Sequence, residues 1–110
     1  MDLEETLIQK IESLGPIRWT RSFGWIGAHT EDKFFCGYKV IDENYLHILL
    51  ILSPVDFDKA LESGDFEKFE FGKTWVEGEV GSEEETEAVW PFIISAHRFA
   101  KERKKSPKRK

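Results

Sequence analysis

The chain has 110 residues, enough for one domain with a hydrophobic core, and its 16 Lys/Arg against 21 Asp/Glu leave a formal net charge of −5. No apolar run approaches the ~20 residues of a membrane span, and the acidic N-terminal stretch lacks the apolar region of an export signal. Cys36 is the only cysteine, so an internal disulfide is excluded and a reducing compartment fits best. We therefore expect a cytoplasmic protein without a membrane-spanning segment.

The charge is divided between the two ends of the chain. Residues 1–97 carry 8 Lys/Arg and 20 Asp/Glu, a formal charge of −12, whereas residues 98–110 carry 8 Lys/Arg and 1 Glu, or +7. We expect a folded domain over residues 1–103 and a disordered basic tail over residues 104–110. Such a tail binds phosphate or acidic surfaces, solubilises the chain, or folds back on the acidic body. The candidate polyanion contacts are Lys104, Lys105, Lys108, Arg109 and Lys110.

The first element in chain order is an amphipathic helix over residues 3–14. Its apolar residues recur at i, i+4, i+8 and i+11, and a Gly-Pro pair at 15–16 ends it. Residues 17–23 alternate as a strand does. Gly24 and Gly27 flank Trp25 and permit a bend or bulge, and residues 29–33 suggest a hairpin loop.

The rest of the chain alternates between strands and helices. Residues 34–40 and 45–52 are expected to be strands, the second of them the most buried. Ser53-Pro54 predicts the start of a short helix, and residues 74–80 form a further strand. Ser82 and Glu85 form a capping box for the last helix, in which Pro91 predicts a kink or a restart. This order predicts an α+β fold, an antiparallel sheet of four to five strands flanked by the N- and C-terminal helices.

Several local strings resemble the TfoX N-terminal domain and, more loosely, the wider YjbR-like group. They are RSFG (21–24), DKFFCG (32–37), SPVDFDKAL (53–61), FGKTWVEGEV (71–80) and EAVWPFIISA (87–96). The resemblance covers roughly residues 3–100 and implies this fold together with a binding or regulatory role. The chain departs from the family where ILLILS lacks the Arg that often precedes the short helix, and where EDK replaces the usual turn glycine.

No catalytic or metal-binding constellation is visible in the sequence. The cysteine and the three histidines lie on four different elements without the spacing of a metal-ligand pair, namely Cys36, His29, His47 and His97. We expect Cys36 to be a small buried thiol and His97 to be packed in the last helix. Asp56 and Asp58 are explained by the N-terminus of the short helix. The sequence therefore predicts a chain without a cofactor and without enzyme activity.

Trp25 is the aromatic residue that we expect to be partly exposed, because it lies between two glycines on an expected loop. With Arg18, Arg21, Phe23 and His29 it forms a candidate surface for a small ligand or a protein partner. The alternative is that Trp25 is a lid over one end of the sheet.

Three functions follow, in decreasing order of support. The first is a non-enzymatic binding or regulatory module that uses the surface around Trp25. The second is a nucleic-acid-associated adaptor that acts through the basic tail. The third is a small metal-free enzyme, which requires His29, Asp32 and Cys36 to converge in one pocket.

Overall fold

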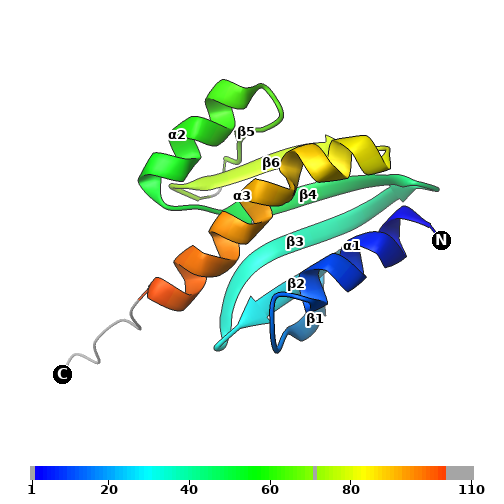
Figure 1. Cartoon of the computed structure of the whole chain (residues 1–110), viewed down its shortest axis with the longest axis horizontal. Coiled ribbons are helices and arrows are strands. Elements are labelled where there is room, and N and C mark those ends of the chain that lie inside the picture. Colours follow the sequence, from blue (N-terminus) through cyan, green and yellow to red (C-terminus); the bar gives the residue numbers. More distant parts are fainter. Residues whose placement is uncertain (1, 71, 104–110) are drawn as a thin grey trace.

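The protein has an α+β fold in which six antiparallel strands form one open sheet with three helices (Figure 1). The computed structural model describes residues 2–70 and 72–103, and the sheet has the strand order β1-β2-β3-β4-β6-β5. The elements are α1 (Leu3–Glu12), β1 (Arg18–Ser22), β2 (Trp25–Thr30), β3 (Lys33–Asp42), β4 (Tyr45–Ile51), α2 (Pro54–Ser63), β5 (Glu67–Lys68), β6 (Trp75–Val80) and α3 (Glu83–Glu102). The predicted fold class is confirmed, whereas the predicted strand number was too low.

Sequence reasoning missed two strands, the two-residue β5 and the longer β2. Phe23 and Gly24 form a tight turn with φ of 53° and 83°, so Trp25 begins a strand and does not lie on a loop. The following loop contains only Glu31 and Asp32, which both adopt positive φ, 51° and 65°. Two consecutive residues with positive φ are the signature of a two-residue hairpin turn, which leaves more of the chain for the strands.

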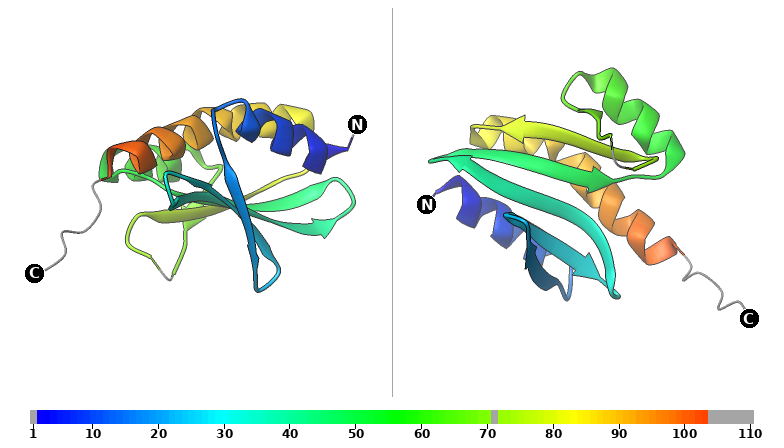
Figure 2. Two further views of the ribbon diagram at one scale, coloured as in Figure 1. Left: turned by 90° about the horizontal axis from the view of Figure 1, so that it is seen from below. Right: turned by 180° about the vertical axis from the view of Figure 1, so that it is seen from behind.

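The helices α1 and α3 lie across the same side of the sheet (Figure 2), and α2 contacts α3, β5 and β6. The strand residues that face these helices include Ile48, Leu50 and Val76, each fully buried, and they meet Leu7 of α1 and Ile93 of α3 in one core cluster. Cys36 is part of that cluster, as predicted. Burial of this apolar side is what holds the helices on the sheet.

Each helix begins at a capping side chain. The side chains of Asp2 and Ser53 accept hydrogen bonds from the third helical N–H in α1 and α2. The predicted capping box of α3 is present in part: Ser82 Oγ accepts from the Glu85 N–H at 3.1 Å. Glu85 Oε1 accepts at 2.6 Å from the N–H of Gly81, one residue before the N-cap, and not from that of Ser82. The helix continues through Pro91 without a restart, so that alternative was wrong.

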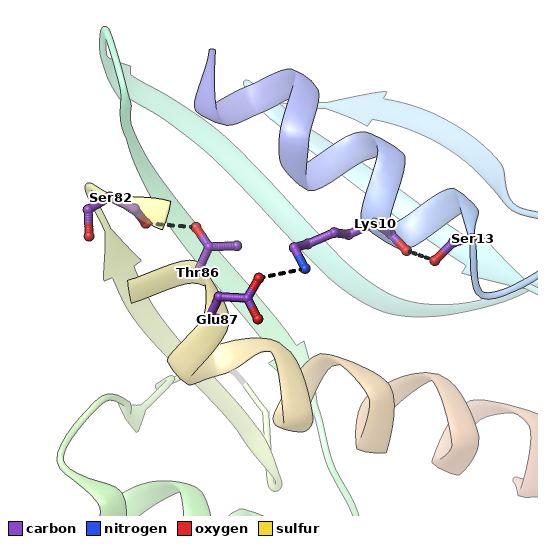
Figure 3. A network of polar contacts seen from close by, with 5 residues as sticks. All are labelled: Lys10, Ser13, Ser82, Thr86 and Glu87. Atoms are coloured by element: carbon purple, nitrogen blue, oxygen red, sulfur yellow. Dashed lines mark hydrogen bonds and ion pairs between the residues drawn. The ribbon is translucent and has the colours of Figure 1, made fainter. Parts of the chain in front are cut away.

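Polar contacts at the surface connect α1 with α3 (Figure 3). The Lys10 ammonium lies 2.9 Å from Glu87 Oε2 and 5.1 Å from the centre of the Trp90 ring. Glu87 is largely exposed, so this ion pair contributes at most about 1 kcal/mol. Burial of the apolar core beneath this ion pair therefore contributes more to the packing of α1 against α3 than the ion pair does.

The C-terminal end of α3 is tied to the first residues of β3. Arg103 Nη2 donates a hydrogen bond of 2.7 Å to the Phe34 carbonyl, and the Lys33 ammonium donates to the Arg103 carbonyl. The predicted basic tail, residues 104–110, lies outside the described residues. Within the described part, no helix combines the length and the apolar character needed to cross a membrane.

Candidate ligand-binding surface

We call the side of the sheet opposite α1 and α3 the open face. The strand register brings Trp25, Phe34, His47, Trp75 and Glu77 to this side. Figure 2 shows the two helices on the other side of the strands. Side chains of the strands themselves must therefore shield any apolar residue that points to the open face.

An aromatic row covers one end of the open face. The ring of Trp75 is nearly parallel to that of Phe34, with centroids 5.6 Å apart, and to that of Phe69, with centroids 5.9 Å apart. Two β4 residues on the same side, Leu49 and Ile51, are only 5% and 7% exposed. The aromatic row is thus a lid that the sheet makes from its own side chains.

Two glycines make room for this lid. Gly27 of β2 and Gly37 of β3 are cross-strand partners, and a Cβ atom at either position would lie 3.0 Å from a carbon of the Phe34 ring. The ring therefore occupies a hollow that only residues without side chains leave open. This close approach explains Gly27, for which the sequence suggested a bend.

Trp25 lies at the other end of the open face in a polar setting. Its ring is tilted against His47 with centroids 5.2 Å apart, and the Lys39 ammonium lies 5.4 Å from the ring centre. His47 Nε2 is 2.8 Å from Glu77 Oε1. Trp25 is half-buried, so it presents an aromatic surface whose position is held by a cation and an imidazole.

The five residues of the predicted surface do not form one patch. Arg18 and His29 are cross-strand partners on the open face, with Arg18 Nε 3.4 Å from Asp32 Oδ1. Phe23, 96% exposed, is on the β1–β2 turn. Arg21 pairs with Ile26 and lines a groove beside α1, on the helix side. The grouping therefore needs correction, because neighbouring residues of a strand point to opposite sides.

The structure adds residues that sequence reasoning missed. The open face carries Phe34, His47, Trp75 and Glu77, from strands that are distant in the sequence. The alternation of side chains along residues 74–80 indicates that Trp75 and Glu77 share one side of a strand. The sequence does not indicate which side of the sheet the helices cover.

His29 lies in a half-buried position that disfavours its charged form. Its Nε2 is 2.9 Å from Thr20 Oγ1, and its ring meets Phe34 edge-on at 5.6 Å. Nδ1 is buried and has no hydrogen-bond partner among the described residues. Burial lowers the pKa of His29, the Arg18 cation lowers it further, and Asp32 opposes both. Protonation of this ring is therefore disfavoured at neutral pH.

His29, Asp32 and Cys36 do not converge in one pocket. Cys36 is fully buried in the core on the helix side, whereas His29 lies on the open face. His97 is buried against Phe35, and burial followed by the Lys101 charge lowers its pKa. No group of three or more His, Cys, Asp or Glu within the described ranges is placed to hold a metal ion.

Cys36 should be inert in the folded protein. Burial raises the pKa of its thiol to about 12, so at pH 8 it holds roughly three orders of magnitude less thiolate than a free cysteine. We expect a colorimetric disulfide reagent to react with it only as fast as the core opens, and promptly after denaturant is added. A prompt reaction without denaturant would contradict the buried position.

Comparisons of the chain with protein families, with characterised proteins and with solved structures return no match. The resemblance to the TfoX N-terminal domain therefore stays a hypothesis that rests on the strings given above.

Proposed function

We propose that the protein is a non-enzymatic binding or regulatory module, as the resemblance to the TfoX N-terminal domain implies, and that it takes a small ligand or a protein partner on the open face. The observation that carries this proposal is Trp25, a half-buried indole that lies outside the core cluster and is flanked by Lys39 and His47. Tryptophan with one surface exposed is enriched at binding sites, because it offers a large rigid contact area at low entropic cost.

The polar groups around Trp25 favour a ligand that is partly apolar and partly charged. Lys39 supplies a cation, and the His47–Glu77 pair supplies a carboxylate within the same patch. Beyond Glu77, the side chains of Glu79 and Glu67 line a hollow of about 300 Å³ together with His47. A ring that covers Trp25 would therefore have both donors and acceptors within reach.

Substitution of Trp25 separates a binding role from a core role. We expect Trp25→Ala to lower the free energy of unfolding by clearly less than the ~3 kcal/mol that marks removal of a large core aromatic. The matched control is Trp90→Ala, since Trp90 packs against the core cluster, and its loss should exceed that of Trp25→Ala. Urea unfolding measures both variants. A loss of about 3 kcal/mol or more at Trp25 would make this residue part of the core and end the proposal.

Binding itself is tested with the full chain labelled with ¹⁵N and a panel of small aromatic compounds, from indole to adenosine. We expect compounds that bind to shift the Trp25 indole N–H signal, and Trp25→Ala to abolish their binding. Shifts that fall only on residues of the helix side would contradict the assignment of the open face.

The second candidate function is nucleic-acid association through the basic tail. It is favoured by the five cations in residues 104–110, which follow directly on the anchored Arg103. For five phosphate contacts to a single strand, affinity should fall about a hundredfold between 50 and 200 mM salt. Neutralising the five cations should abolish the binding of labelled oligonucleotides, and binding that survives both changes would exclude the tail as its cause.

A further inference from the structure

The strand β1 is the outer strand at one edge of the sheet (Figure 1). It pairs with β2, and none of the described strands lies on its other side. A two-residue turn at Phe23 and Gly24 connects β1 with β2, so the flanking residues Ser22 and Trp25 form a hydrogen-bonded pair. The position of this pair determines which backbone groups of β1 point to β2 and which point away from it.

Two residues of β1 direct their backbone groups away from the sheet. Hydrogen-bonded and non-hydrogen-bonded pairs alternate along an antiparallel ladder, so Arg18 and Thr20 bond to β2 as Ser22 does. Trp19 and Arg21 have the opposite orientation, and their N–H and carbonyl groups have no hydrogen-bond partner within residues 2–70 and 72–103. The free edge of β1 therefore presents donors and acceptors to a further strand.

This edge lacks the features that commonly block strand pairing, which are proline, a bulge and an unbalanced charge. The strand contains no proline, and it pairs with β2 without a shift in register. Arg18 Nε lies 3.4 Å from Asp32 Oδ1, which balances the charge of Arg18. Arg21 is exposed and forms no ion pair with a described residue. Arg21 is therefore the group whose charge a partner strand must balance.

A second copy of β1 supplies the missing partners. In an antiparallel pair centred on Thr20, Trp19 of each copy lies opposite Arg21 of the other, and these residues exchange N–H···O=C bonds. Opposite residues of two paired strands share one side of the sheet. Arg21 therefore comes beside the half-buried indole of Trp19 and beside Glu12, whose exposed carboxylate accepts a hydrogen bond of 2.9 Å from Trp19 Nε1. The cation of each copy thus meets an aromatic ring and a carboxylate of the other.

The same register gives an apolar partner to Phe23, whose ring is almost fully exposed. Phe23 follows β1 directly, and the half-buried Ile17 precedes it. Pairing about Thr20 brings Phe23 of one copy next to Ile17 of the other. A shift by two residues in one direction places Arg21 opposite Arg21, and like charges in this position are destabilising. A shift in the other direction places Phe23 next to Gly15, without an apolar contact.

We infer that two copies of this chain pair through the free edges of their β1 strands, antiparallel and centred on Thr20, and form a two-fold symmetric dimer with one continuous sheet. The helices of both copies then lie on one side of that sheet, and the two open faces lie on the other. The contact is small, so the dimer is weak, with a dissociation constant on the order of 100 µM. The inference is independent of the proposed function, because it uses the edge of the sheet and not its open face.

Sedimentation equilibrium of the full chain between about 5 and 500 µM brackets this dissociation constant. We expect the mean mass to rise from 12.9 kDa toward twice this value. Amide hydrogen exchange at the same concentrations locates the contact. The N–H groups of Trp19 and Arg21 should exchange at least about threefold more slowly at the high concentration, whereas that of Thr20, which already bonds to β2, should change little. A monomer at every concentration overturns the inference, and so does a dimer in which the exchange of Trp19 and Arg21 is unchanged.

Exchange of charges between the copies tests the register. Arg21→Glu brings two carboxylates together, and Glu12→Arg brings two cations together, so each variant alone should dimerise at least about tenfold more weakly than the natural chain. An equimolar mixture of the two variants restores an attractive pair at both ends of the contact. We therefore expect the mixture to form a mixed dimer with nearly the natural affinity, which also shows that both variants fold.

The matched control is Lys68→Glu, the same reversal of charge on β5, the strand at the other edge of the sheet. We expect it to leave dimer formation unchanged. A larger loss for Lys68→Glu than for Arg21→Glu would place the contact at β5 and refute the β1 pairing. A mixture of Arg21→Glu and Glu12→Arg that stays monomeric would refute the pairing as well.

Discussion

Replacing Phe35 by alanine is expected to lower the free energy of unfolding by about 3–5 kcal/mol, the range for truncation of a fully buried phenylalanine. Phe35 is the extra residue of a β-bulge, because Cys36 pairs with Ala28 while Phe34 already pairs with His29. The bulge directs the Phe35 side chain to α3, where its ring meets His97 edge-on at 5.1 Å. Its exposure is 0%, so the substitution opens a cavity at the junction of sheet and helix.

The matched control makes the same chemical change at the surface. Phe23 lies on the β1–β2 turn and is 96% exposed, so Phe23→Ala should change the stability by no more than about 0.5 kcal/mol. Urea unfolding followed by tryptophan fluorescence measures both variants. Equal losses for Phe35→Ala and Phe23→Ala would contradict the burial that separates the two positions.

Features that depend on a few adjacent residues were predictable from the sequence. The cap at Ser82 and Glu85 was identified from the spacing of the two residues. The structure contains the Ser82 hydrogen bond to the Glu85 N–H, and Glu85 accepts from the N–H of Gly81, one residue before the expected Ser82 N–H. The start of α2 after Ser53 was predicted for the same reason, because a capping hydroxyl followed by proline has a local mechanism. Burial of Cys36 followed from its position in an apolar strand.

Features that depend on partners distant in the sequence were not predictable. The β2 strand contains Gly27 and His29 and follows Gly24 directly, a composition that suggested a bend and a loop. It is held as a strand because β1 and β3 pair with it on both sides. The Glu31–Asp32 turn has two non-glycine residues with positive φ, a conformation that the strands on either side impose.

The candidate site shows the same limit. Arg21 was grouped with Trp25 because the two are close in the sequence, whereas the pleat sends their side chains to opposite sides of the sheet. The aromatic row of Phe34, Phe69 and Trp75 assembles residues that are up to 41 positions apart. Sequence reasoning can suggest that such aromatics share a sheet, whereas only the strand order places them side by side.

Gly78→Ala is expected to destabilise the fold by about 1–3 kcal/mol, although replacing a strand glycine by alanine would otherwise gain about 0.5–1 kcal/mol. A Cβ atom at Gly78 would lie 2.5 Å from the Asp65 carbonyl oxygen. The Asp65 carbonyl belongs to the backbone, which cannot shift aside as the end of a flexible side chain can. The whole segment leading into β5 must therefore move. That segment carries Phe66, which is 4% exposed and packs edge-on against Phe92 of α3 at 5.5 Å.

The control for this substitution is Gly37→Ala, in the middle of the sheet. Its new Cβ atom would lie 3.0 Å from the end of the Phe34 ring, a side chain on the open face that can shift. We therefore expect a smaller loss at Gly37, measured by thermal unfolding of the two variants side by side. If Gly37→Ala costs as much as Gly78→Ala, the Phe34 ring is held as rigidly as backbone. The aromatic row would then be a fixed part of the fold, and ligand contacts on the open face would be confined to the Trp25 end.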